Sequence, residues 1–257
     1  DPSIIAVLSV YFLRSYMGYG NINVREPGAS SNYHSLQVSA NRRFASRLQY
    51  GVSYTWSKSL DYNSDDAATV SNVIPVRIWN YGLSSFDRAH ILKANWLPDL
   101  PNPAERNHPL RWAVNDWQVS GIYSASTGAP AAIGFSTVNA VDITGSSTEG
   151  PRIVLNGEPS LSRGQRSFER WFDTSVAALP ATGTIGNAAR TNIRLPGINN
   201  WDLTAYKNFR FKERVNAQLR GEFYNAFNHT QYSNADTTAR FDAQGRASVE
   251  FTAPDFN

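Results

Sequence analysis

Residues 215–224 alternate strictly between small or apolar side chains and polar ones, and this pattern constrains the fold more than any other feature. One set is Val215, Ala217, Leu219, Gly221 and Phe223, and the other is Asn216, Gln218, Arg220, Glu222 and Tyr224. Successive side chains of a β-strand leave opposite faces of the sheet, so a period of two predicts a strand with one apolar and one polar face. A short charged turn at 210–213 pairs it with 201–209 in a predicted hairpin.

Two interpretations of this hairpin are open. Each strand has roughly the 9–11 residues that a tilted strand needs to cross a bilayer. Aromatic residues gather near the strand ends, as they do in the interfacial girdles of outer-membrane barrels; they are Trp201, Phe209, Phe211, Phe223, Tyr224 and Phe227. A soluble antiparallel sheet with one solvent-facing side gives the same alternation.

Other segments extend the prediction of an all-β fold. Alternating or apolar patterns predict strands at 33–44, 48–57, 88–97, 116–126 and 246–251, whereas 4–13 fits either a strand or a short helix. A helical turn is expected at 167–172, within the longest connection. Most connections alternate between short and long, in the order 45–47, 58–87, 98–115 (a medium one), 127–199, 210–213 and 225–245. A transmembrane barrel sorts its connections in this way, with short turns on one rim and long loops on the other.

The composition fits a barrel but does not exclude a soluble alternative. The chain has 257 residues, of which 18% are charged, with 7 Trp, 12 Tyr and 13 Phe. Low charge with many aromatics suits a barrel with a polar lumen and an apolar belt, and it also suits a carbohydrate-binding β-sandwich. The net charge of +3 is too small to favour nucleic acid as a partner, and the lack of cysteine excludes disulfides and thiolate metal sites.

Four stretches resemble one family. They are residues 19–62, 79–92 (WNYGLSSFDRAHIL), 196–209 (PGINNWDLTAYKNF) and 220–232 (RGEFYNAFNHTQY). Together they look like the C-terminal barrel portion of Oar-like TonB-dependent receptors, which are large outer-membrane receptors with an N-terminal carboxypeptidase-regulatory-like domain. The similarity runs over roughly residues 14–245.

The resemblance implies an antiparallel up-and-down transmembrane barrel of about twenty-two strands, plugged by a separate N-terminal domain. The sequence offers about eight strands, no plug and no TonB box. We therefore expect residues 1–257 to be a single β domain that is a piece of such a receptor, with a soluble β-sandwich or small barrel as the alternative fold.

The resemblance also implies a location and partners. The location is the bacterial outer membrane, the partner of the wall is outer-membrane lipid, and TonB would be reached only through the missing plug domain. No cofactor is expected, and no catalytic activity. A bulky nutrient would contact the loops 58–86 and 127–199.

Two motifs with possible chemistry are weak. Asp61, Asn63 and Asp65 begin like a calcium loop, but Asp66 replaces the required glycine and Asn72 the terminal glutamate. A solvated acidic loop is the favoured interpretation of this stretch. Glu169 and Asp173 could form a carboxylate pair on a short helix, as a glycosidase needs, although such pairs are common on protein surfaces.

Exposed tryptophans define the remaining alternative. A soluble glycan-binding β-sandwich would use aromatic side chains as a platform, and the candidates are Trp79, Trp112 and Trp171. A hydrolase on the same scaffold would use the carboxylate pair Glu169 and Asp173.

Overall fold

A computed structural model describes most of the chain. The described residues are 15–20, 22, 24–25, 27–45, 47–65, 74–104, 109–138, 140, 142–144, 150–167, 170–211, 215–232 and 235–247. The predicted segment 4–13 lies outside these residues, as does most of the predicted last strand at 246–251. Within the described residues, no helix has the length and apolar character that crossing a bilayer requires.

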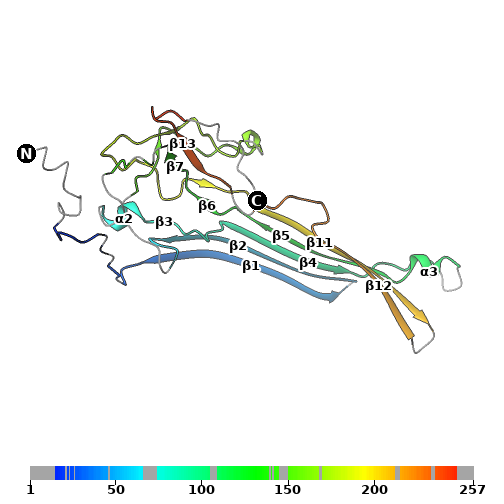
Figure 1. The fold of residues 1–257 in the computed structure, drawn as a ribbon. Helices are drawn as coiled ribbons and strands as arrows, with labels where there is room; N and C mark the ends of the chain where they lie inside the picture. Colours follow the sequence, from blue (N-terminus) through cyan, green and yellow to red (C-terminus); the bar gives the residue numbers. More distant parts are fainter. Residues whose placement is uncertain are drawn as a thin grey trace, which may run out of the picture.

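Long antiparallel strands form one open sheet, which we call the wall (Figure 1). Its order follows the chain: β1 (Ser31–Ala45), β2 (Leu48–Asp61), β4 (His90–Pro98), β5 (Trp117–Ser126), β11 (Ile198–Phe211) and β12 (Val215–Phe223). A short strand, β3 (Gly82–Leu83), pairs with the end of β2. Each long strand lies where the alternating pattern predicts one, and the predicted hairpin is confirmed as β11 and β12.

Strand order sorts the connections onto the two ends of the wall. The turn end carries the connections 46–47, 99–116 and 212–214, and the second of these contains α3 (Arg111–Val114). The loop end carries 62–89, with α2 (Val76–Trp79), and the long segment 127–197. This arrangement confirms the sorting into short and long connections that the sequence predicts.

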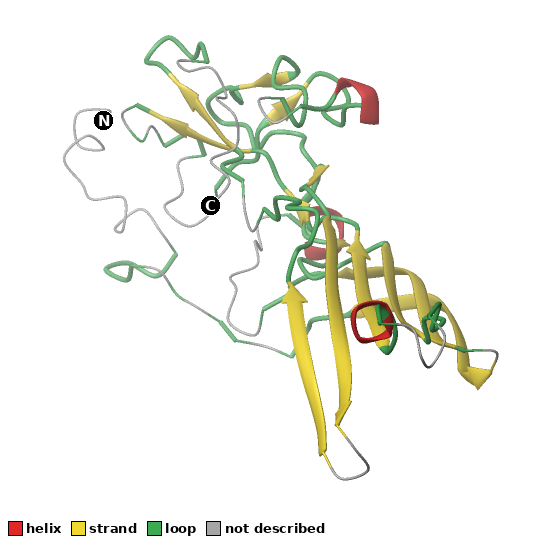
Figure 2. Ribbon diagram, turned by 90° about the vertical axis from the view of Figure 1, so that its right-hand side faces the viewer, coloured by secondary structure: helices red, strands yellow, loops and turns green. Residues whose placement is uncertain are grey.

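The long segment from the loop end is not a plain loop. It contains β6 (Pro130–Ala131), β7 (Gly134–Thr137), β8 (Val154–Leu155), the 3₁₀ turn η2 (Arg163–Gln165), β9 (Ala177–Ala178) and β10 (Ile193–Arg194). Three small two-stranded sheets result, and in one of them β7 pairs in parallel with β13 (Thr238–Phe241). We call this part the loop cap, and it stands at one end of the long strands in Figure 2.

The main apolar core of the described chain lies in the loop cap rather than against the wall. Its members have between 0% and 5% of their surface exposed; they are Ile133, Ile153, Phe172, Ala188, Ile193, Ala239 and Phe241. Sequence patterns predict a connection here because its strands are too short to produce a detectable alternation.

The helical turn expected at 167–172 is wrong for the residues that can be checked. Arg170, Trp171 and Phe172 are not helical, and Phe172 forms an antiparallel bridge with Ser160. Burial of the phenyl ring in the cap core holds the backbone extended at this point. Among the described residues nearby, a short helical turn occurs at η2, closed by a capping box between Ser162 and Gln165.

Candidate functional site

The wall has one apolar and one polar face across all of its long strands. Opposed residues of an antiparallel pair share a face, and the register aligns the apolar sets of neighbouring strands. The apolar face includes Leu36, Val38, Val52, Tyr54, Leu92, Ala94, Val119, Tyr123, Trp201, Leu203, Ala205 and Leu219. The other face carries Ser39, Ser53, Lys93, Asn95, Ser120, Ser124, Thr204, Asn208, Gln218 and Glu222, with Ile91, Leu97 and Ile122 as apolar exceptions.

Nothing in the described chain covers the outer part of the apolar face. Leu36 and Val38 on β1 are each 54% exposed, and Leu219 on β12 is 63% exposed. Apolar surface of this extent is unfavourable in water and is typical of a surface that meets lipid or another protein. The predicted β-sandwich alternative is therefore wrong, because a sandwich would pack a second sheet on this face.

Aromatic side chains lie on the apolar face in two groups, which we call the loop-end band and the turn-end band. Towards the loop end lie Trp56, Tyr123, Trp201 and Phe227, with the rings of Tyr123 and Trp201 centred 4.3 Å apart. Towards the turn end lie Tyr50, Trp96, Trp117 and Phe209. The two bands meet on the middle strands, where the rings of Trp96 and Trp201 are centred 5.8 Å apart. Aromatic rings among aliphatic side chains on an uncovered apolar face are typical of a transmembrane barrel wall.

One glycine allows the turn-end band to pack. A Cβ atom added to Gly121 would come within 2.1 Å of the ring of Trp96, so only glycine leaves room for the indole on the neighbouring strand.

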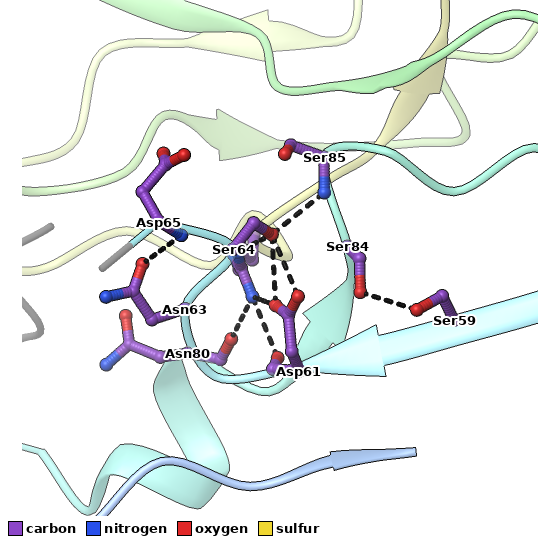
Figure 3. Close-up of polar contacts among 9 residues, drawn as sticks. Ser59, Asp61, Asn63, Ser64, Asp65, Asn80, Ser84 and Ser85 are labelled. Atoms are coloured by element: carbon purple, nitrogen blue, oxygen red, sulfur yellow. Dashed lines mark hydrogen bonds and ion pairs between the residues drawn. The ribbon is translucent and has the colours of Figure 1, made fainter. Parts of the chain in front are cut away.

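A polar network joins the loop end of β2 to the loop cap (Figure 3). Asp61, the last residue of β2, accepts hydrogen bonds from the Ser64 hydroxyl at 2.9 Å and from Arg190 Nη1. Nη1 of Arg190 also donates to the backbone oxygen of Asn80 at 3.2 Å, and its Nη2 donates to Ser64 Oγ at 2.9 Å. The side chain of Asp61 is 4% exposed, so Arg190 supplies the charge that its burial requires.

A second ion pair lies beside the first. The carboxylate of Asp87 is 1% exposed and accepts from Ser59 N at 2.7 Å and from Arg194 Nη2 at 2.6 Å. Arg194 also donates to the backbone oxygen of Gly128 at 3.2 Å. Asp61 and Asp87 precede and follow β3, whereas both arginines belong to the cap, so the two pairs fasten the loop cap to the wall. We call them the cap–wall ion pairs.

An open groove of about 550 Å³ lies in the loop cap beside these ion pairs. Its lining combines small and apolar residues (Leu83, Leu155, Pro159, Ala189) with charged or amide side chains (Glu158, Arg166, Asn187, Arg194). Arg166 donates from Nε to the backbone oxygen of Leu161 at 2.7 Å, and its guanidinium lies 5.3 Å from the ring centre of Trp171. The hydroxyl and backbone N–H of Ser160 lower the pKa of Glu158, which therefore stays charged near neutral pH.

The predicted metal loop is organised around hydrogen bonds within the protein. Asp61 is engaged by Arg190 and Ser64, and Asn63 Oδ1 accepts the backbone N–H of Asp65 at 3.1 Å (Figure 3). No group of three or more His, Cys, Asp or Glu side chains is placed to hold a metal ion in the described part of the chain.

The three tryptophans proposed for glycan binding do not form one site in the described structure. Trp79 lies on α2 under the guanidinium of Arg152, whereas Trp112 lies on α3 at the opposite end of the wall (Figure 1). Trp171 packs against the cap core and donates from Nε1 to the backbone oxygen of Arg194 at 2.6 Å.

The carboxylate pair can be placed only in part. Glu169 lies outside the described residues. Asp173 accepts a hydrogen bond from the Ser175 hydroxyl at 2.8 Å, which lowers the pKa of its carboxyl. A lowered pKa disfavours a general acid, whose role needs a raised one.

Sequence reasoning did not find the cap–wall ion pairs. Arg190 is 129 positions from Asp61, and Arg194 is 107 positions from Asp87. Local periodicity carries no information about contacts of this separation. The available signal was the stretch SSFDRAHIL at 84–92, which places Asp87 just before a strand.

Comparison with known proteins agrees with this geometry. Residues 2–253 match the model of one family, described as an outer membrane beta barrel domain. No curated protein and no solved structure matches the chain. The family match spans nearly the whole chain and explains an apolar face rich in aromatic residues on a sheet whose connections are sorted by length. The chain therefore belongs to the outer membrane beta barrel domain family and is a β-barrel protein of the outer membrane.

Proposed function

We propose that this chain forms part of the barrel wall and the ligand-binding loops of a TonB-dependent receptor that imports a bulky nutrient. The observation that carries the proposal is the structured loop cap, whose own core and groove stand at the loop end of a membrane-facing wall. A barrel that served only as an anchor would not need a packed cap with a recess. The resemblance of 19–62, 79–92, 196–209 and 220–232 to Oar-like receptors adds support.

The direction of the wall supports binding from outside the cell. In barrels of the outer membrane, short turns face the periplasm and long loops face the exterior. The groove therefore opens towards external solutes, and the turn end faces the periplasm. Energy would come from TonB acting through a plug domain, and the wall and loops would be passive in chemistry.

The groove favours a ligand rich in hydroxyl groups. The terminal nitrogens of Arg166 offer donors, and Glu158 offers acceptors that stay charged near neutral pH. A polyhydroxylated solute such as an oligosaccharide presents both acceptors and donors, and its apolar ring faces can lie against Leu155 and Pro159. A small solute would leave much of the groove of about 550 Å³ empty.

A groove-filling substitution tests the binding site. The chain, purified in detergent, is titrated with a panel of oligosaccharides while its tryptophan fluorescence is recorded. Ala189→Trp fills the groove and should abolish the response, whereas Ala181→Trp, at an exposed cap position outside the groove lining, should leave it unchanged. Equal binding by wild type and Ala189→Trp would remove the groove as the site.

Transport is tested separately in cells that carry the receptor. Uptake of a solute that binds in vitro should stop when TonB is deleted and when an uncoupler collapses the proton gradient. Uptake that continues under both conditions would show a passive channel and would overturn the TonB-dependent mechanism.

A further inference from the structure

Four exposed apolar side chains lie at the turn end of the wall, in α3 with its N-cap and at the first residue of β5. Leu110 is 59% exposed, Trp112 48%, Val114 40% and Trp117 37%. The first three belong to α3 or its N-cap, and Trp117 begins β5. We call them the turn-end patch. A connection facing water alone would have no reason to hold so much apolar surface outward.

The turn-end patch is held firmly against the wall. Trp117 donates from its indole Nε1 to the backbone oxygen of Ala113 at 2.7 Å, which ties α3 to β5. The backbone N–H of Asn208 donates to the oxygen of Asp116 at 3.1 Å, which ties the same segment to β11. The patch therefore has a fixed position relative to the apolar face of the wall.

Lys207 shows on which side of the wall the patch lies. It is 3% exposed and belongs to the apolar face, paired across the strands with Trp117. Its Nζ donates to the backbone oxygen of Asn115 and lies 5.6 Å from the ring centres of Trp117 and Phe209. The segment at the base of α3 therefore covers this lysine and lies on the apolar side of the wall.

The charge beside the patch suits a lipid phosphate. The guanidinium of Arg111 lies 5.8 Å from the ring centre of Trp112, so a cation borders the apolar surface. Asp116 lies on the wall side of α3, adjoining Trp117 in sequence and next to Asn208 in space. An aromatic ring with an adjacent arginine is the composition of side chains that settle at the headgroup level of a bilayer.

From these observations we infer that α3 and its neighbours form an interfacial anchor in the phospholipid leaflet on the turn side. Leu110, Trp112 and Val114 enter the boundary between headgroups and acyl chains, and Arg111 binds a lipid phosphate. The occupant is membrane lipid because the patch is continuous with the lipid-facing apolar face through Trp117 and Phe209. The anchor would fix the vertical position of the barrel by means of a connection rather than a strand.

Site-specific labels test the anchor, and the chain suits them because it contains no cysteine. An environment-sensitive fluorophore is attached to Trp112→Cys, and the protein is reconstituted into vesicles of phosphatidylethanolamine and phosphatidylglycerol. Lipids brominated close to the headgroup should quench this label. The matched control is Ile78→Cys on α2, where the native side chain is 76% exposed and quenching should be absent.

A third label shows whether a negative result concerns the anchor alone or the whole apolar face. Val38→Cys lies on the apolar face in the middle of β1 and should be quenched by lipids brominated along the acyl chain. If Val38→Cys is quenched and Trp112→Cys behaves like Ile78→Cys, the anchor is overturned and the wall is not. If Val38→Cys is also unquenched, the apolar face does not meet lipid, and the anchor fails with it.

A separate measurement tests whether Arg111 binds a lipid phosphate. Quenching of the label at 112 by brominated phosphatidylglycerol, relative to brominated phosphatidylcholine, measures the local preference for an anionic lipid. Arg111→Gln should lower this preference about fivefold, which is the usual contribution of one basic side chain near a charged membrane surface. Arg77→Gln on α2 should leave it unchanged. If the labelled protein with Arg111 intact shows no preference for the anionic lipid, the proposal that Arg111 binds a lipid phosphate is overturned.

Discussion

In the wall, Leu219 keeps 63% of its surface exposed and Leu36 keeps 54%. In the loop cap, Ile153 is fully buried and Phe241 is 2% exposed. The wall pairs its backbone groups along long strands and leaves one side apolar, whereas the cap folds short strands around a core. The difference teaches that the two regions exclude water from apolar side chains by different means: the wall needs a bilayer, and the cap needs only its own chain.

The cap–wall ion pairs lie at the junction between the wall and the loop cap. A region stabilised by lipid and a region stabilised by a core can respond independently to a substitution, unless the junction couples them. The following substitutions act on one region at a time and then on the junction.

The largest effect is expected in the cap core. Phe172 is 5% exposed, and Phe172→Ala should destabilise the cap by about 4 kcal/mol, because it removes a buried ring and leaves a cavity. Amide hydrogen exchange should show faster exchange in the cap and unchanged exchange in the wall. Phe86→Ala, at a position 62% exposed, is the control and should have little effect. Equal loosening of cap and wall would mean that they form one cooperative unit.

A charge on the apolar face should have a slightly smaller effect, confined to the wall. Ala94 lies between Val52 and Tyr123 in the middle of the face. Ala94→Arg should cost about 3 kcal/mol in vesicles, because an arginine near the bilayer midplane loses its hydration. Asn95→Arg, one residue away on the polar face, should be tolerated. Urea unfolding from vesicles measures both, and similar costs would contradict the assignment of the two faces.

Breaking the junction should cost less than either. Asp87→Asn removes the charge that balances Arg194, and we expect a loss of about 2 kcal/mol, moderated because the Arg194 side chain is 31% exposed. Limited proteolysis should cut the connections 62–89 and 127–197 faster while the wall stays protected. Asp242→Asn, which breaks an exposed ion pair with Arg246, should change little. Unchanged cleavage in Asp87→Asn would mean that the cap holds its place without the ion pair.

The smallest effect is a dependence of the cap on acidity. The backbone N–H of Thr238 donates to Asp236 at 2.9 Å, and together with Arg240 it lowers the pKa of this carboxyl, outweighing the effect of burial. A carboxyl with a lowered pKa in the folded state stabilises that state above its ordinary value of about 4, and the contribution disappears as the pH falls through the lowered pKa.

Asp236→Asn should remove this part of the acid response. Hydrogen exchange of β7 and β13, followed from pH 5 downwards, should change less with pH in the variant than in wild type. Identical pH profiles would show that Asp236 does not contribute to the stability of the pair.

The sequence by itself determined the wall. The alternation in 33–44, 48–57, 116–126 and 215–224 is local, because each side chain's face follows from its parity along the strand. Bounds predicted in this way agree with β1, β2, β5 and β12 to within a few residues. The lengths of the connections then predicted which end of the wall carries short turns and which carries long loops, because an antiparallel order sends alternate connections to opposite ends.

Only the tertiary structure decided the cap, the groove and the cap–wall ion pairs. Strands such as β8 and β9 have two residues each, too few to show a period, and they exist because Ile153 and Phe172 pack together. Arg190 and Arg194 find their carboxylates across more than a hundred positions, and local sequence patterns do not encode contacts of that separation. Side-chain parity is a property of one strand, whereas a core or a groove is a property of segments brought together by folding.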